Sequence, residues 1–307
     1  MYKLRISGCN TTKWYKMSAK VTIGLCVKNS EKTIRDSIDS IIGQKYPSEL
    51  IQLVIVDGCS KDKTMPIIAS AIAETGVRVE TYSDEGKGLG AARQIVVNNA
   101  NGKYVIFVDA DVIIFDDFVR RHVDFMAENS NVGVAFGKPM FQEGTLVSTV
   151  WSLYCYINGG FLGNDATIYR PEAIKEVHGF DLNIKGAGED VDLIDKIRVK
   201  GWLVSTNEKA RFFHKSRDTL REFSTERIWF GYGGHYLYHK NRIAQPLWHD
   251  LPIGALRYGL KMAFKAYRLT QRKISFLIPL QLIFGNVSWW VGFIKGHLYG
   301  FGHGKSS

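Results

Sequence analysis

YVIFVDADV, residues 104–112, places two carboxylates directly after an apolar run. The run Tyr104–Val108 is too apolar for a surface strand, so it predicts a buried strand whose end carries Asp109 and Asp111. Alternation along an extended chain points both carboxylates to one side. Two such oxygen ligands suit a Mg²⁺ or Mn²⁺ ion that also contacts phosphate. The position agrees with this, because open α/β sheets bind ligands at the carboxyl ends of their strands. A solvated acidic turn is the alternative that this stretch alone leaves open.

Strands and helices alternate on both sides of this stretch. Upstream, we expect strands at 21–27, 53–57 and 77–82 and helices at 30–44, 64–74 and 90–100. Downstream, helical patterns cover 115–128, 171–177, 189–199 and 219–240, with strand-like runs near 132–136 and 202–206. Apolar strands that alternate with helices indicate a parallel sheet covered on both faces. The sequence therefore predicts an α/β fold with a Rossmann-like, mostly parallel sheet.

The composition narrows the class of protein. A chain of 307 residues can bury one large core, and its net charge of +10 indicates an anionic partner such as nucleotide phosphates, acidic lipids or nucleic acid. The four cysteines are scattered without a C-x-x-C pair, which argues against a thiolate metal site and a disulfide scaffold. The first 20 residues lack an apolar run, so we expect no signal peptide and a catalytic part in the cytoplasm.

Polar residues that suit a nucleotide lie at a second strand end and a helix entry. Asp57 ends the expected strand 53–57, where its carboxylate could accept hydrogen bonds from ribose or a base; a capped turn is the alternative. The segment EGKGLGAAR (85–93) lacks the G-x-G-x-x-G spacing of a dinucleotide-binding fingerprint. Its Lys87 and Arg93 could contact phosphate or hold Asp109. A surface charge is the alternative, above all for Lys87.

Candidate acid–base and metal-binding residues lie further on. Glu189 and Asp190 begin the expected helix 189–199, where either could act as a general base towards a sugar hydroxyl or simply complement the helix dipole. His214 follows an apolar stretch and is either a structural histidine or, beside the aspartate pair, a ligand better suited to Mn²⁺ than to Mg²⁺.

An aromatic-rich segment covers residues 224–240 and includes Arg227 and Trp229. Aromatic side chains of this kind can stack on sugar faces or lie at a membrane interface. Core packing is the alternative for about half of them.

The C-terminal region has the pattern of a membrane-associated segment. A basic stripe and an apolar stripe run side by side at helical spacing. The first contains Arg257, Lys261, Lys265 and Arg268, and the second contains Leu256, Leu260, Phe264 and Tyr267. Such a helix lies on an anionic membrane, or it packs on the domain with a solvated basic face. Residues 274–294 then lack charged side chains over roughly 31 Å of helix, which is enough to span a bilayer core, although Pro279 and Gly285 suggest a kink or partial immersion.

These patterns divide the chain. We expect an N-terminal extension at 1–18, a catalytic domain at 19–218, amphipathic interface helices at 219–273, a membrane-embedded helix at 274–294 and a tail at 295–307. Lysine and arginine gather before the apolar helix rather than after it, so the catalytic domain is expected on the cytoplasmic face of the cell membrane.

The ordered motifs resemble those of family 2 inverting glycosyltransferases with a GT-A fold. They are VKNSEKTIRDSIDSIIGQ, IVDGCSKDKT, GKGLGAAR, the D-x-D motif in VDADV, and GED, over roughly residues 19–215. The basic helix and apolar tail further resemble the membrane-bound cellulose-synthase-like and dolichyl-phosphate-mannose-synthase-like members, and archaeal mannosyltransferases among them.

The resemblance implies a role for each matching residue. The nucleotide-sugar site is lined by Val27, Glu31, Asp57, Lys87 and Arg93, and the metal and diphosphate are held by Asp109 and Asp111. The catalytic base is Asp190, and His214 matches a metal-binding histidine. The acceptor and sugar side contains Glu189, Arg227 and Trp229. The implied reaction needs Mn²⁺ or Mg²⁺ and transfers a hexose to a lipid-linked glycan acceptor. The first candidate donor is GDP-mannose, which supplies mannose, and the second is UDP-glucose.

Two departures from the family patterns matter. The Q-x-x-R-W signature is absent, because Ser224 stands where glutamine would precede Arg227 and the tryptophan comes one position late at Trp229. We therefore expect one or few sugars per acceptor. In the dolichyl-phosphate-mannose group of enzymes a third metal ligand lies two residues after the D-x-D motif, but here that position is Ile113. Isoleucine cannot bind a metal ion, so His214 could supply the third ligand instead.

Two other classes of function compete with this one. A nucleotidyltransferase would need a glycine-rich loop after the first strand, which VKNSEK (27–32) lacks. A non-catalytic adaptor for membranes or nucleic acid would use the positive charge but has no need of four aspartates at strand and helix ends. We therefore expect nucleotide sugar, lipid-linked acceptor and membrane lipids as partners, no nucleic acid, and a possible homo-oligomer through the C-terminal helix.

Overall fold

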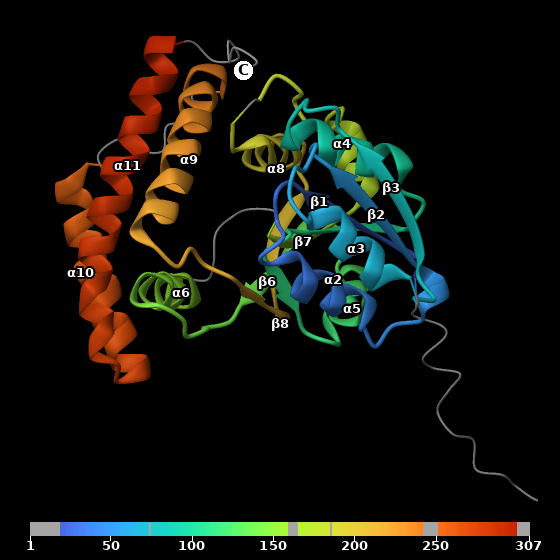
Figure 1. The fold of residues 1–307 in the computed structure, drawn as a ribbon, viewed down its shortest axis with the longest axis horizontal. Coiled ribbons are helices and arrows are strands. Elements are labelled where there is room, and N and C mark those ends of the chain that lie inside the picture. The colour runs from blue at the N-terminus through green and yellow to red at the C-terminus, as the bar shows by residue number, and fades with distance from the viewer. Residues whose placement is uncertain (1–18, 74, 159–164, 185, 242–250, 300–307) are drawn as a thin grey trace, which may run out of the picture.

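The structure is a computed structural model that describes residues 19–73, 75–158, 165–184, 186–241 and 251–299 (Figure 1). The extension expected at 1–18 and the last part of the expected tail lie outside the described residues.

One eight-stranded sheet forms the centre of the molecule, in the order β3-β2-β1-β4-β7-β6-β8-β5. Its first half is parallel, as expected: β1 (Val21–Val27), β2 (Ile51–Asp57), β3 (Arg78–Ser83) and β4 (Tyr104–Val108). Its second half is mixed and contains β7 (Ala166–Tyr169), β6 (Val132–Pro139), β8 (Leu203–His214) and β5 (Val112–Ile114).

Helices cover both faces of the sheet, which explains why its central strands are apolar throughout. Leu53 and Ile55 of β2 face a core formed with α2 (Ile34–Ile42), α3 (Thr64–Ile72) and α5 (Phe118–Glu128). Val54 and Val56 of the same strand face the opposite core. That core is formed with α4 (Leu89–Asn99), α7 (Pro171–Glu176) and α8 (Glu189–Val199).

A helical layer lies beside the sheet (Figure 1). It consists of α6 (Leu146–Asn158), α9 (Leu220–Asn241), α10 (Pro252–Thr270) and α11 (Ile278–Tyr299). Short 3₁₀ turns at Ser48–Leu50 and Lys273–Leu277 complete the elements. A third apolar core joins this layer, with Trp151 of α6, Phe223 of α9 and Ala263 of α10 among its buried residues.

The outer face of this layer is apolar. Leu256, Leu260 and Phe264 of α10 are exposed, whereas the face of α10 that packs inward carries small residues such as Ala263 and Ala266. The exposed apolar surface continues on α11, for example at Leu280. Lys273–Tyr299 is the one helical segment of the described chain that is long and apolar enough to cross a membrane, by length and composition only.

Several elements were not predicted. The strands β5 and β7 have only three and four residues, too few for an alternating pattern to be visible. Helix α6 was missed because it is apolar on most of its surface, being buried between the sheet and the outer helices. Strand β8 extends to His214, well beyond the expected 202–206, because its second half pairs with β5.

Buried His122 should make the stability of the fold depend on pH. The side chain lies on α5, fully buried and edge-on to Phe118, and neither ring nitrogen has a hydrogen-bond partner among the described residues. Burial lowers the pKa of His122 to about 3. Below about pH 6.5 the unfolded chain therefore binds a proton that the folded chain does not, and the free energy of unfolding falls by about 2 kcal/mol between pH 7.5 and pH 5.

A His122→Leu variant should lose this part of the pH dependence in urea denaturation at the two pH values. Exposed His178 provides the control, since its glutamine variant should keep the wild-type difference. An unchanged pH dependence in His122→Leu would contradict the assignment.

Candidate active site

The carboxyl end of β4 brings together residues from three separate motifs. Asp109 follows β4 directly, Arg93 comes from α4, and Glu189 and Asp190 begin α8. Arg93 is almost fully buried, and its guanidinium donates to Asp109 across 2.9 Å and to Glu189. Its Nη1 also lies 3.8 Å from Asp190. The structure thus places three predicted carboxylates around the buried guanidinium of a fourth predicted residue, Arg93.

Burial sets the electrostatics of this cluster. It raises the pKa of Asp109 against the opposing effect of Arg93, and the neighbouring Asp111 raises it further. It also raises the pKa of Glu189 to about 7, again against Arg93. A guanidinium shared by several carboxylates holds them at fixed positions but leaves negative charge concentrated at the strand end.

Asp111 points to a second group of polar side chains. His214, the last residue of β8, lies with its Nε2 3.6 Å from Asp111, and Arg217 lies 3.2 Å from the other carboxylate oxygen. The antiparallel pairing of β5 with β8 produces this contact, because it sets Val112 opposite His214. Burial lowers the pKa of His214, but Asp111, Asp165 and Glu226 outweigh it and the net direction is upward.

Asp165 is a member of this site that sequence reasoning missed. Its backbone carbonyl accepts from the Asp109 amide at 3.0 Å, because β7 begins where the antiparallel β4 ends. Burial raises the pKa of Asp165 to about 7, an effect that His214 opposes and the carboxylates of Asp109 and Asp111 increase. The sequence places Asp165 just before ATIY (166–169), but its role could be predicted only if ATIY was recognised as a strand.

These side chains line one end of a cavity of about 470 Å³ that continues between the sheet and the outer helices. Arg227 and Trp229 of α9 line it as well. The Arg227 guanidinium lies 4.6 Å from the ring centroids of both Trp151 and Phe230. Apolar side chains from the helical layer, including Leu237, Leu282, Trp289 and Phe293, line it too. The cavity therefore combines charged side chains from the strand and helix ends with apolar side chains from α9 and α11.

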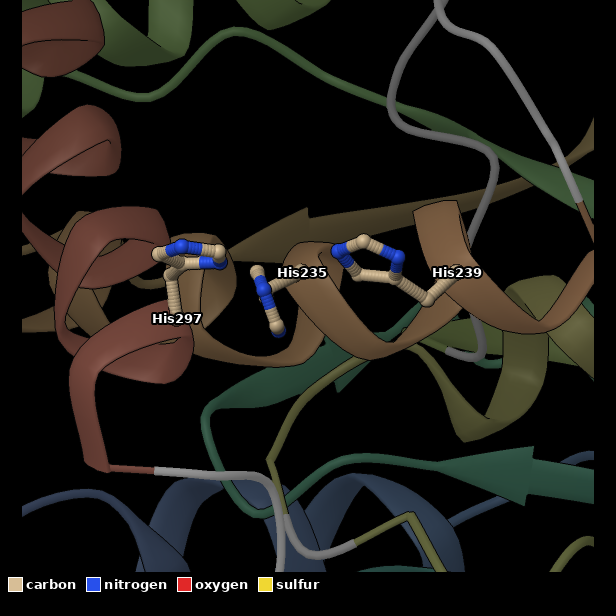
Figure 2. A group of neighbouring side chains, drawn as sticks. All are labelled: His235, His239 and His297. Carbon is tan, nitrogen blue, oxygen red and sulfur yellow. The ribbon is translucent and has the colours of Figure 1, made fainter.

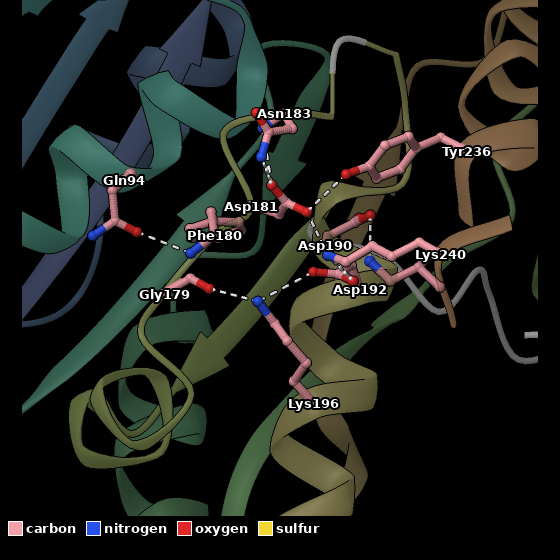
Figure 3. Close-up of polar contacts among 11 residues, drawn as sticks. Gln94, Gly179, Phe180, Asp181, Asn183, Asp190, Asp192, Lys196, Tyr236 and Lys240 are labelled. Carbon is pink, nitrogen blue, oxygen red and sulfur yellow. Dashed lines mark hydrogen bonds and ion pairs between the residues drawn. The ribbon is translucent and has the colours of Figure 1, made fainter. Parts of the chain in front are cut away.

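Helix α9 is tied to the loop before α8 by buried polar contacts (Figure 3). Lys240 pairs with Asp181 and, at 2.8 Å, with the fully buried Asp192. Tyr236 donates to Asp181 at 3.2 Å. These contacts fix the wall of the cavity relative to Asp190.

The residues expected on the nucleoside side lie at neighbouring strand ends, away from this cavity lining. Val27 and Asp57 are register partners at the ends of β1 and β2. Asp57 accepts from the Ser60 amide at 3.1 Å, and Glu31 accepts from the Lys63 amide at 3.0 Å, so both brace the loop 58–63. Lys87 is exposed and pairs with Glu85 at 2.6 Å. Their proposed contacts to a nucleotide stay predictions.

Four side chains beside the end of β4 could offer ligands to a divalent cation. Asp111 and Asp165 offer carboxylate oxygens, His214 offers an imidazole nitrogen, and Asp109 adjoins them. Oxygen ligands with one imidazole suit Mn²⁺ and, less well, Mg²⁺. Burial raises the pKa of Asp109 and Asp165, and neighbouring carboxylates raise it further, so a cation bound here would favour the ionised form of both.

Comparison with known proteins finds a family match that covers the sheet from β1 to β7. Residues 22–172 match the family described as Glycosyl transferase family 2. Among curated relatives, the poly(ribitol-phosphate) beta-N-acetylglucosaminyltransferase TarS of Staphylococcus aureus is 30% identical over 101 residues, which cover 33% of this chain and 18% of that protein. The poly(ribitol-phosphate) beta-glucosyltransferase of Bacillus spizizenii is 32% identical over 121 residues, 39% of this chain and 19% of that protein. The chain thus matches about a fifth of the length of these relatives.

Solved structures extend the likeness beyond the family match. The mannosyltransferase PcManGT from Pyrobaculum calidifontis, solved with GDP-mannose and Mn²⁺, superposes with a TM-score of 0.63 at 18% identity, covering 89% of this chain and 87% of that one. At this identity the superposition establishes the fold. The chain therefore has a GT-A fold, and its residues 22–172 are similar to the glycosyltransferases of family 2.

Proposed function

We propose that the protein is a metal-dependent inverting glycosyltransferase that moves a hexose from a nucleotide sugar to a lipid-linked glycan acceptor at a membrane. The observation that carries the proposal is one cavity lined both by the polar side chains of Asp109, Asp111, Asp190 and His214 and by apolar side chains of α9 and α11. This arrangement suits a reaction between a charged donor and an acceptor with an apolar part.

Asp190 is the proposed catalytic base. It would take the proton from the acceptor hydroxyl as that oxygen attacks the anomeric carbon from the face opposite the leaving diphosphate, which inverts the configuration. It lies in the first turn of α8, near the positive end of the helix dipole. Arg93 acts as a positioning residue, since it contacts both Asp109 and Glu189 and lies close to Asp190.

The proposed ligands of Mn²⁺ or Mg²⁺ are Asp109, Asp111, His214 and, in addition, Asp165. Such an ion neutralises negative charge that develops on the departing diphosphate. Arg217 lines the same end of the cavity and adds a cation that can contact phosphate oxygens. Arg227 and Trp229 line the same cavity, where they could contact the sugar or the acceptor head.

The exposed apolar surface of α10 and α11 supports a membrane location. Leu256, Leu260 and Phe264 face outward beside Arg257 and Lys261, so apolar and basic side chains share one exposed face. A helix of this kind binds anionic lipid surfaces. The cytoplasmic orientation of the catalytic domain and the residue limits of the membrane segment belong to the same proposal.

The donor can be identified by direct binding. GDP-mannose is our first candidate; UDP-glucose and UDP-N-acetylglucosamine come next, because the curated relatives are named for transfer of glucose and N-acetylglucosamine. Calorimetry of the purified protein with each donor, with and without Mn²⁺, should reveal one that binds only with the ion. That donor should then be consumed when a polyprenyl-phosphate-linked glycan is added. Metal-independent binding of every donor, or RNA binding without transfer, would contradict the proposal.

A further inference from the structure

Three histidines meet at the ends of α9 and α11, outside the cavity lining. His235 and His239 lie one turn apart on α9, and His297 lies near the end of α11 (Figure 2). One ligand nitrogen from each ring lies within 4.8 Å of the others. The His235 ring stands between the other two, with centroid distances of 4.5 Å to His239 and 5.6 Å to His297.

Close helix packing brings the three rings together. A Cβ atom added at Gly292 would lie 1.9 Å from the Ile228 carbonyl oxygen, and one at Gly231 would lie 1.9 Å from the Trp289 carbonyl oxygen. One turn beyond Gly292, a Cβ atom at Gly296 would lie 3.0 Å from the His235 Cβ. The two backbones therefore approach as closely as glycine permits, and Gly296 leaves the space that the His235 ring occupies.

His235 is a buried polar side chain without a partner. It is 9% exposed, and neither of its ring nitrogens has a hydrogen-bond partner among the described residues. Burial and the neighbouring rings of His239 and His297 lower its pKa, so the ring stays neutral at physiological pH. A buried imidazole that donates and accepts nothing is costly, whereas a neutral imidazole is the form that binds a metal ion.

We propose that His235, His239 and His297 form a binding site for a divalent transition-metal ion of the Zn²⁺ class, which links α9 to α11. Three imidazoles with a fourth position open to solvent are a ligand set that Zn²⁺ and its neighbours Co²⁺ and Ni²⁺ accept. Zn–N bonds of about 2.1 Å place tetrahedral ligand nitrogens roughly 3.4 Å apart, so rotation of the exposed His239 and His297 side chains closes the site. The site is independent of sugar transfer, because none of its ligands lines the cavity of the catalytic site.

Metal binding by the full chain, purified without a polyhistidine tag, tests the proposal. The protein carries Asp111→Ala so that the catalytic site does not contribute. Titration with Zn²⁺ should give one ion per chain, and Co²⁺ should give the intense visible absorption of a four-coordinate nitrogen-rich site. Zn²⁺ should also raise the melting temperature, because an ion that binds the folded chain alone stabilises it.

His239→Gln and His297→Gln are the decisive variants, because both side chains are exposed and neither change disturbs the core. Each should weaken Zn²⁺ binding at least about tenfold and abolish the Co²⁺ spectrum. The matched control is His178→Gln, which alters an exposed histidine elsewhere and should bind as the parent does. Undiminished binding in the two cluster variants, or no Zn²⁺ binding by the parent, would overturn the proposal.

Discussion

Replacing Asp190 by asparagine should abolish sugar transfer while donor binding persists. The substitution preserves the size of the side chain but removes the ability to accept the proton of the acceptor hydroxyl. Loss of a general base lowers the turnover number by about 10³-fold. Donor affinity should stay close to wild type, because the Arg93 guanidinium keeps its contacts with Asp109 and Glu189 when the more distant Asp190, at 3.8 Å, loses its charge.

The measurement separates turnover from binding. Single-turnover transfer reports the chemical step, and calorimetry with donor and Mn²⁺ reports affinity. Asp195→Asn is the matched control: the residue lies on the same helix, is half-buried and makes only a 3.9 Å contact with Arg198. The control should transfer sugar normally. Wild-type turnover in Asp190→Asn would eliminate this residue as the base.

The parallel half of the fold could be predicted from sequence because β1, β2 and β4 are largely apolar runs and helical patterns separate them. Asp57 and Asp109 close β2 and β4, and both strands occur where they were expected. The order of the sheet then follows from helical crossovers, since parallel strands joined by helices place their carboxyl ends on one edge. The sequence thus suggested that Arg93 could hold Asp109, a contact that the structure contains, whereas Asp190 was assigned to the site by the family resemblance.

The rest of the site depends on long-range contacts that leave no local pattern. Asp165 reaches the site through the antiparallel pairing of the short strand β7 with β4. Arg217 follows β8 and contacts Asp111 only because β8 runs past its expected end to pair with β5. Trp289 lines the cavity because α11 packs along α9 through glycine contacts.

Replacing Asp111 by alanine should remove the dependence of donor binding on the divalent ion. Asp109 already accepts from Arg93 at 2.9 Å, which leaves Asp111, beside His214, as the carboxylate best placed to bind a metal ion. Loss of such a ligand should weaken donor binding in Mn²⁺ at least about tenfold and reduce transfer roughly 100-fold. Calorimetry with donor, in Mn²⁺ and in a chelator, and Mn²⁺ binding followed by electron paramagnetic resonance, measure the two effects.

The control distinguishes loss of a metal ligand from loss of a negative charge. Asp116 lies on the same segment, is exposed and pairs with Lys45 at 2.6 Å on the surface. Asp116→Ala removes the same charge from the chain and should leave the response to Mn²⁺ intact. His214→Ala should weaken Mn²⁺ binding more than Mg²⁺ binding, because imidazole suits the former ion better. The proposed metal site would be wrong if Asp111→Ala bound the donor with wild-type affinity both in Mn²⁺ and in chelator. Asp111 would then serve the site only through its contacts with His214 and Arg217.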